Sequence, residues 1–135
     1  MERLIDSSLW VDYFRKKTTA EALAQIRHEI TAPHACICEP VAFEILRSAR
    51  PDERGLVQRH FEVLNPLATP EDLWRKAILL GQRCRDRGFT IGALDLLIAT
   101  VALHHEAEII TFDGDFALIA QVESALRVQV LPRAG

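Results

Sequence analysis

Acidic residues stand in this chain at positions where a folded core tends to exclude charge. Asp6 directly follows one apolar run, and Asp113 follows another. Glu44 and Asp95 each interrupt a run of apolar residues. Carboxylates are almost never fully buried unless they are paired or bind a metal ion. These acids lie far apart in the sequence, so the chain is expected to adopt a fold that brings their side chains together at one site.

The length and composition predict a single globular domain, residues 1–135. The chain has 135 residues, of which 49% are hydrophobic, and this is enough for one core. No apolar run is long enough to cross a membrane, and the first residues lack the layout of a signal peptide. The three cysteines are an odd number, and reduced core thiols are the expected state. The expected location is the cytoplasm, with no membrane partner.

Short apolar runs that predict strands alternate with segments that have helical periodicity. Strands that alternate with helices form a parallel sheet covered on both faces. The expected fold class is therefore α/β. The predicted strands are 2–5, 34–38, 107–112 and 128–131, and the predicted helices are 7–17, 18–30, 40–49, 51–64, 70–87, 93–105 and 115–126.

The predicted elements place the acids at one edge of the sheet. Ligands of open parallel sheets bind beyond the carboxyl ends of the strands. Asp6 and Asp113 follow the first and third predicted strands. Glu44 lies at the edge of the apolar face of its helix. Asp95 falls in the first turn of its helix, where the positive end of the helix dipole is expected to keep it ionised.

Each acid also has an ordinary structural explanation. Asp6 is a suitable N-cap for the helix that begins with two serines. Glu44 can pair with Arg47 or a neighbouring serine, and Asp95 can complement its helix terminus. The segment 113–115 is typical of a turn, with its second aspartate as an N-cap. Taken singly these explanations suffice in most cases, but the four acids together favour a shared site.

Electrostatic repulsion between the carboxylates determines what such a site must contain. Two carboxylates about 6 Å apart repel by roughly 3 kcal/mol at an effective dielectric of about 20. Several such pairs rival the stability of a whole domain, which is about 5–15 kcal/mol. Converging acids must therefore share protons or bind cations. Oxygen ligands without His or Cys select a hard ion, Mg²⁺ or Mn²⁺.

The acidic composition does not exclude a nucleic-acid partner. The formal net charge is −3, which by itself argues against nucleic acid. If the acids, with Asp115 included, held two divalent ions, the formal charge would change from −3 to +1. The basic residues are mostly arginines, whose guanidinium group is well shaped for phosphate oxygens.

Four blocks of the sequence, 4–8, 40–46, 95–99 and 111–116, resemble those of PIN-domain ribonucleases, and they occur in that family's order. The small size resembles the toxin of a VapBC toxin–antitoxin pair. The resemblance implies a three-layer α/β/α fold with a parallel sheet of four or five strands. It also implies an Mg²⁺- or Mn²⁺-dependent endoribonuclease that hydrolyses RNA, forms a homodimer and is neutralised by a cognate antitoxin.

Carried over motif by motif, the resemblance also implies roles for individual residues. It implies that the metal is bound by Asp6, Asp95, Asp113 and Asp115, and that Ser7 or Ser8 provides a supporting hydroxyl. The catalytic acids would be Asp6, Glu44, Asp95 and Asp113.

The helix predicted over 70–87 is rich in basic residues. Arg83 and Arg87 lie four residues apart and share a face. This pattern is typical of a solvated helix, and it also suits a track for RNA phosphates whose affinity would fall with salt. Both interpretations remain open from the sequence.

Two other classes of function compete with a nuclease. A phosphoacceptor receiver domain also gathers acids at strand ends, but it needs a lysine after a late strand, and this chain has no lysine beyond Lys76. A catalytically silent PIN-like domain that only binds proteins is the second alternative. Such a domain has no need to retain the full acid set.

Overall fold

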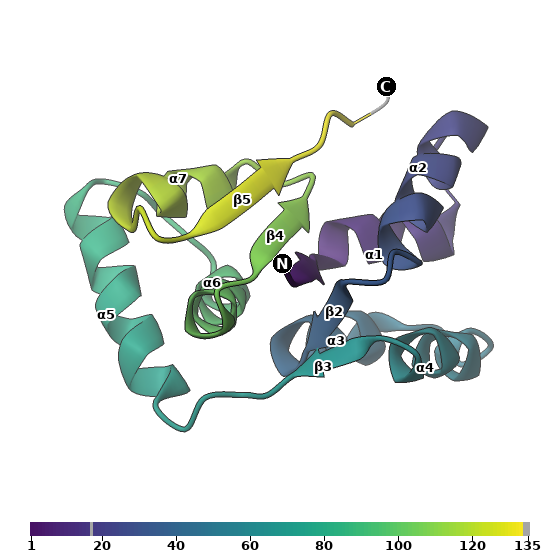
Figure 1. Ribbon diagram of the computed structural model, residues 1–135, viewed down its shortest axis with the longest axis horizontal. Coiled ribbons are helices and arrows are strands. Elements are labelled where there is room, and N and C mark those ends of the chain that lie inside the picture. Colours follow the sequence, from purple (N-terminus) through teal and green to yellow (C-terminus); the bar gives the residue numbers. More distant parts are fainter. Residues whose placement is uncertain (17, 134–135) are drawn as a thin grey trace.

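The computed structural model describes residues 1–16 and 18–133, so that Lys17, at the end of the first predicted helix, lies outside the described part. A central sheet of parallel strands is covered by helices on both faces (Figure 1). The predicted α/β class and three-layer architecture are confirmed. The strands are β1 (Arg3–Ile5), β2 (Ala35–Cys38), β3 (Asn65–Leu67), β4 (Glu108–Thr111) and β5 (Arg127–Val130).

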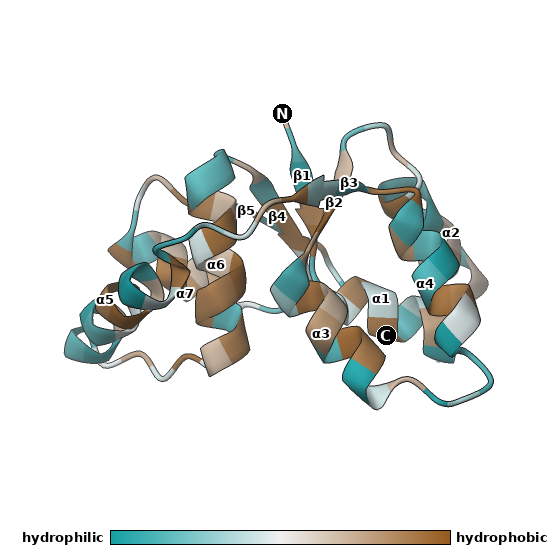
Figure 2. Cartoon of the chain, turned by 90° about the horizontal axis from the view of Figure 1, so that it is seen from below, coloured by the Kyte–Doolittle hydropathy of each residue, from teal (hydrophilic) through white to brown (hydrophobic). Residues whose placement is uncertain are grey.

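The helices form two layers, one on each side of the sheet (Figures 1 and 2). Figure 2 shows hydrophobic residues gathered on the strands and on the inner helices, with hydrophilic residues more frequent on the outer ones. The first layer contains α1 (Ser7–Arg15), α2 (Ala20–Ile30), α3 (Glu39–Ser48) and α4 (Arg54–Glu62), and the second contains α5 (Leu73–Asp86), α6 (Ala93–His105) and α7 (Asp115–Val122).

The strand order β3-β2-β1-β4-β5 determines where a ligand can bind. The chain moves outward from β1 to β2 and β3, and then returns to add β4 on the other side of β1. The order therefore reverses between β1 and β4, and such a switch point is where open α/β sheets bind ligands. The receiver-domain alternative is wrong, because receiver domains have the strand order 2-1-3-4-5.

Strand β3 was missing from the predicted elements. It is short, it contains Pro66, and two of its three residues are exposed, so it lacks the apolar run that marked the other strands. Proline is tolerated there because β3 is an edge strand, paired only with β2. As a consequence, Asp113 follows the fourth strand of the sheet rather than the third.

Helix α6 is the centre of the second layer, as its apolar sequence predicted. Ile98 and Val101 are fully buried, and the helix contacts α3, α5 and α7. Close packing of α5 depends on Gly81, because a Cβ atom there would lie 3.0 Å from Leu96 Cδ1. Among the described residues, no helix combines the length and apolar character that crossing a bilayer demands.

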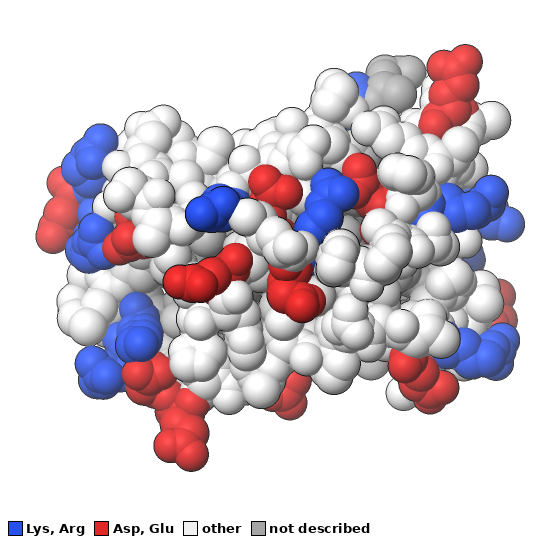
Figure 3. Space-filling model, in the orientation of Figure 1, with Lys and Arg blue, Asp and Glu red and all other residues white. Residues whose placement is uncertain are grey.

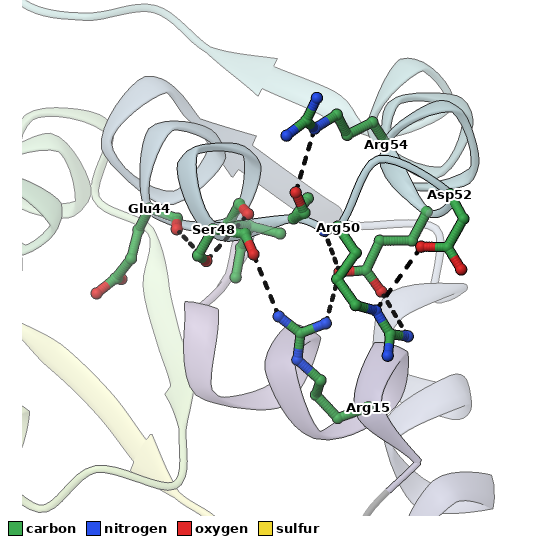
Figure 4. A network of polar contacts seen from close by, with 9 residues as sticks. Arg15, Glu44, Ser48, Arg50, Asp52 and Arg54 are labelled. Atoms are coloured by element: carbon green, nitrogen blue, oxygen red, sulfur yellow. Dashed lines mark hydrogen bonds and ion pairs between the residues drawn. The ribbon is translucent and has the colours of Figure 1, made fainter.

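A buried carboxylate joins α1 to the loop between α3 and α4 (Figure 4). Glu53 Oε1 accepts hydrogen bonds from Arg15 Nη1 at 2.5 Å and from the backbone amide of Arg50 at 2.9 Å. Arg15 Nη2 also donates to the Ser48 carbonyl at 3.3 Å, at the end of α3. The pKa of Glu53 is lowered, first by the Arg50 amide and then by Arg15. This network therefore fixes α3, which carries Glu44.

Replacing Glu53 with Gln is expected to lower the melting temperature at neutral pH. The folded protein holds the pKa of Glu53 below its ordinary value of 4.5. The contribution of the carboxylate is therefore present above that pH and is lost as the pH falls through the folded value. Thermal unfolding followed by circular dichroism should show the gap between wild type and Glu53→Gln narrowing under acid conditions. Asp52→Asn, at an exposed neighbour, is the control, and a gap that does not depend on pH would contradict the assignment.

Candidate metal centre

The carboxyl ends of β1 and β4 and the starts of two helices bring the acids to one place. Asp6 follows β1 and Asp113 follows β4, while Asp95 lies in the first turn of α6 and Asp115 begins α7. Oxygen atoms of Asp95, Asp113 and Asp115 all lie within 4.8 Å of one another. Asp6 and Glu44 are not part of this close group among the described residues, but after burial their charges help to raise the pKa of Asp95, so both lie near it.

Asp6 is buried and held by hydroxyl and amide donors. Its Oδ2 atom accepts hydrogen bonds from Ser8 Oγ at 2.9 Å, from the Ser8 amide at 3.3 Å and from Thr111 Oγ1 at 2.8 Å. Oδ1 receives only a 3.4 Å contact from Ser7 Oγ. The capping explanation for Asp6 is confirmed, since it is the N-cap of α1. The cap occupies one carboxylate oxygen and leaves the other largely available to a cation.

Thr111 is a site residue that the sequence did not reveal. It is fully buried, donates to Asp6 Oδ2 at 2.8 Å, and accepts a hydrogen bond from the Asp113 amide at 2.9 Å. Its hydroxyl thereby fixes two acids from different strand ends relative to each other. Strand alternation could have identified it, because residues two apart share a face and Thr111 lies two positions before Asp113.

The Glu44 carboxylate does not form either of the surface pairs that offered an ordinary explanation for it. The Ser48 hydroxyl donates to the backbone carbonyl of Glu44 at 3.2 Å, and the Glu44 side chain points away from the Arg15 network (Figure 4). The Arg47 guanidinium lies 5.8 Å from the centre of the Phe43 ring. Glu44 Oε1 is buried and, among the described residues, has no hydrogen-bond partner. An orphaned carboxylate oxygen is costly, and a cation or a bound water would satisfy it.

The turn explanation for segment 113–115 is also correct. The Asp115 amide donates to Asp113 Oδ1 at 2.9 Å, which shapes the turn that leads into α7. The expectation that Asp115 is an N-cap is wrong, because Gly114 occupies that position and Asp115 is the first helical residue. The turn directs both carboxylates toward Asp95 without using all their oxygen atoms.

The pKa of Asp95 reflects its burial and the negative charges of the other four acids. Burial raises its pKa from 3.8 to about 7, and the negative charges of Asp6, Asp113, Glu44 and Asp115 add to this in that order. The expectation that the helix dipole keeps Asp95 ionised is therefore wrong for the metal-free protein. Within the described part of the chain, no Arg, Lys or His forms an ion pair with any of these acids.

The donor set suits a divalent cation. All candidate ligands are carboxylate oxygens, which hard ions prefer. Two ligands of one small divalent ion, each about 2.1 Å from it, lie at most about 4.2 Å apart, so small side-chain rotations would bring the three aspartates into range. A cation would also supply the positive charge that the protein itself does not place there.

Arg83 and Arg87 lie on the outer face of α5, away from the acids. Arg83 donates to Glu123 Oε2 at 2.7 Å and to the Val122 carbonyl at 2.6 Å, so it contacts the end of α7 opposite Asp115. The Arg87 guanidinium lies 5.6 Å from the centre of the Phe89 ring. Figure 3 shows basic side chains over α5 at the left of the molecule, with acidic ones among them.

Comparison with known proteins identifies the family. The sequence matches the PIN domain over residues 3–122. The chain belongs to the PIN domain family. This PIN domain is of the VapC type: it is 35% identical over 124 residues to Ribonuclease VapC11 of Mycobacterium tuberculosis, covering 88% of this chain and 92% of that protein. VapC ribonuclease Mb1587 of Mycobacterium bovis matches to the same extent, 35% over 124 residues.

Solved structures share the fold of this PIN domain. The DNA-bound VapBC of Salmonella typhimurium superposes with a TM-score of 0.74 at 14% identity, covering 96% of this chain and 98% of that one. VapBC2 of Rickettsia felis, bound to a promoter DNA fragment, gives 0.72 at 15% identity, covering 98% and 100%. At such low identity the likeness concerns the fold alone.

The Asp95→Asn variant is expected to be more stable than wild type in EDTA at pH 8. The folded protein raises the pKa of Asp95 from 3.8 to about 7. Ionisation of Asp95 therefore leaves the stability unchanged below pH 3.8 and lowers it by the full amount above pH 7. Removal of the charge should stabilise the metal-free protein by about 1–2 kcal/mol, allowing for screening by solvent. Urea unfolding measures this difference.

With added Mg²⁺, wild type should become more stable than Asp95→Asn, because only wild type has the full set of metal ligands. Asp86→Asn, at an exposed acid on α5, serves as the control and should change neither result. If Asp95→Asn were less stable than wild type in EDTA, the acids would not repel one another as the geometry indicates.

Proposed function

We propose that this PIN domain is an Mg²⁺- or Mn²⁺-dependent endoribonuclease that hydrolyses RNA phosphodiester bonds as the toxin of a type II toxin–antitoxin system. The observation that carries the proposal is the convergence of acids at one place, where oxygen atoms of Asp95, Asp113 and Asp115 lie within 4.8 Å of one another. The relatives of known name are ribonucleases, and they cover most of the chain. RNA and an antitoxin as partners imply the cytoplasm as its location.

The proposed roles follow from which carboxylate oxygens are free. Asp95, Asp113 and Asp115 hold the ion, and Asp6 contributes its Oδ1 atom from the buried side. When bound, the ion lowers the pKa of a coordinated water and neutralises charge that develops on the phosphate. Glu44 Oε1, which has no hydrogen-bond partner within the described residues, orients the attacking water and accepts its proton. The hydroxyls of Ser8 and Thr111 keep the Asp6 carboxylate in place.

The energetics favour a nuclease over a silent protein-binding domain. A carboxylate whose pKa is raised to about 7 destabilises the metal-free fold at neutral pH. A domain that only bound other proteins would gain stability by replacing Asp95 with a neutral residue. Retention of this costly group is expected where a bound cation both relieves the repulsion and supports catalysis.

Asp6→Asn and Asp95→Asn are each expected to reduce Mg²⁺-dependent RNA cleavage by at least about a hundredfold, as loss of a catalytic group usually does. Asparagine retains the size of the side chain and, at position 6, an N-cap oxygen, so the fold should persist. Cleavage of a fluorescent single-stranded RNA, with circular dichroism of each variant, measures both effects. EDTA should abolish cleavage by wild type. Near-normal cleavage by a folded variant would contradict the proposed catalytic role of the residue that it replaces.

We further propose that a cognate antitoxin covers the acids. Structures with the same fold include the VapBC assemblies from Salmonella typhimurium and Rickettsia felis and a toxin–antitoxin complex from Klebsiella pneumoniae. Asp95, Asp113 and Asp115 are partly exposed, and in the described part of the chain no Arg, Lys or His pairs with them. A partner segment with basic residues would therefore inhibit the enzyme by occupying the cation region.

A homodimer is proposed through an exposed apolar surface formed by α3 and α5. Phe43 and Trp74, which line one groove with Leu94 and Leu97, are 58% and 68% exposed. Ile78 lies one turn beyond Trp74 on the same face of α5 and is also exposed. Large apolar side chains grouped in this way usually mark an interface, and a second copy of this chain would bury the same residues by symmetry.

Trp74→Glu is expected to convert the dimer to a monomer, because a carboxylate would be buried without a partner at the centre of the interface. Size-exclusion chromatography with light scattering should show the molar mass falling by half. Val63→Glu is the matched control, since Val63 is 83% exposed but lies after α4, away from this surface. Equal masses for wild type and Trp74→Glu would contradict the proposed interface.

Arg83 and Arg87 are proposed as a secondary RNA contact on α5. Both side chains are exposed, and arginine suits phosphate well. To bind phosphate, Arg83 must first release Glu123, with which it is paired at 2.7 Å. Their contribution to RNA affinity is therefore expected to be smaller than that of an arginine free of such a partner.

A further inference from the structure

The C-terminal segment places an arginine near the carboxyl end of β4, the strand that Asp113 follows. After β5 the chain remains beside β4, because the Leu131 amide donates to the Thr111 carbonyl at 2.8 Å. The guanidinium of Arg133 then lies 4.9 Å from the centre of the Phe112 ring. Phe112 follows β4 and precedes Asp113 in the sequence, so this arginine lies near the carboxyl end of β4, on the side that the Phe112 ring faces.

Arg133 is held at this position from two sides without being neutralised. Its Nη2 atom lies 3.8 Å from Asp12 Oδ2 on α1, and its side chain is 57% exposed. Asp12 is six residues beyond Asp6, which is about 9 Å along the helix. The guanidinium therefore lies outside the carboxylate cluster, and more than half of its side chain is exposed.

We propose that Arg133 binds a phosphate of the RNA substrate adjacent to the one at the metal centre, with Phe112 orienting its guanidinium; this rests on the proposed ribonuclease function. A cluster of carboxylates repels the neighbouring phosphates of an RNA strand even when a cation holds the scissile one. A positive group at the rim offsets that repulsion. The planar guanidinium can stack on an aromatic ring while its edge donates to phosphate oxygens.

A purely structural role for Arg133 is weaker on the same geometry. The 3.8 Å separation from Asp12 is at the outer limit of an ion pair, and exposed pairs of this kind contribute about 0–1 kcal/mol. Such a pair would restrain the C-terminal segment only slightly. The ring contact with Phe112 fixes the direction of the guanidinium more than it stabilises the fold.

The test compares RNA affinity and its salt dependence across variants made in an Asp95→Asn background, which prevents cleavage. The probe is a fluorescein-labelled single-stranded RNA of mixed sequence, with Mg²⁺ present. Arg133→Ala should weaken binding about three- to tenfold and reduce the slope of log K against log salt by about 0.7, the value for one phosphate on a single strand. Arg133→Lys should retain the slope, because it retains the charge.

Two variants separate a phosphate contact from a structural one. Arg127→Ala removes an exposed arginine from the start of β5, at the other end of the strand that precedes Arg133, and should leave both affinity and slope unchanged. Asp12→Asn removes the ion-pair partner but retains the guanidinium, so RNA should bind with equal or higher affinity. If Asp12→Asn and Arg133→Ala weakened binding equally, the role would be structural and the proposal would be wrong.

Cleavage by the otherwise unaltered enzyme distinguishes failure of this proposal from failure of the proposed function. If Arg133 binds phosphate, Arg133→Ala should raise KM and leave kcat nearly unchanged. Active wild type with an unchanged KM in Arg133→Ala would overturn the inference alone, as would tighter RNA binding by that variant. Absence of any Mg²⁺-dependent cleavage by wild type would overturn the proposed function as well.

Discussion

Mutual repulsion among carboxylates is the interaction that the rest of this structure must withstand. The pKa of Asp95 rises to about 7 because it is buried near four other acids. Donors from Ser8 and Thr111 hold Asp6 against that repulsion, and the packed core around α6 keeps Asp95 from moving away. The metal-free protein is thus less stable than its packing would allow, and binding of a cation is coupled to folding.

Strand order is what allows four remote segments to meet. Because β1 and β4 are neighbours at the switch point, the residues that follow them emerge side by side. The helices after β2 and before β4 then approach from opposite faces and supply Glu44 and Asp95. Each of these helices is fixed independently: α3 by the Glu53 network, and α6 by the close approach that Gly81 permits.

Much of this arrangement could be predicted from the sequence, and the exceptions have physical causes. The bounds of α6 were predicted correctly because its apolar run is long, and an acid inside such a run is conspicuous. Strand β3 was missed because Pro66 and two exposed positions hide an edge strand. The protonation of Asp95 was misjudged because the effect of the helix dipole is outweighed by burial and, after it, by the charges of acids from distant segments. Thr111 was missed because its role depends on a partner more than a hundred residues away.

Asp6 both caps helix α1 and is a proposed metal ligand, and these two roles affect which substitutions related proteins can accept. A descendant that abandons chemistry would still need a capping residue such as Asp or Asn at position 6, because helix α1 begins there. Selection would instead discard Asp95 first, since without a cation that side chain only weakens the fold. A capping residue at position 6 therefore says little about enzymatic competence, whereas a neutral residue at position 95 is the change we expect where catalysis has been lost.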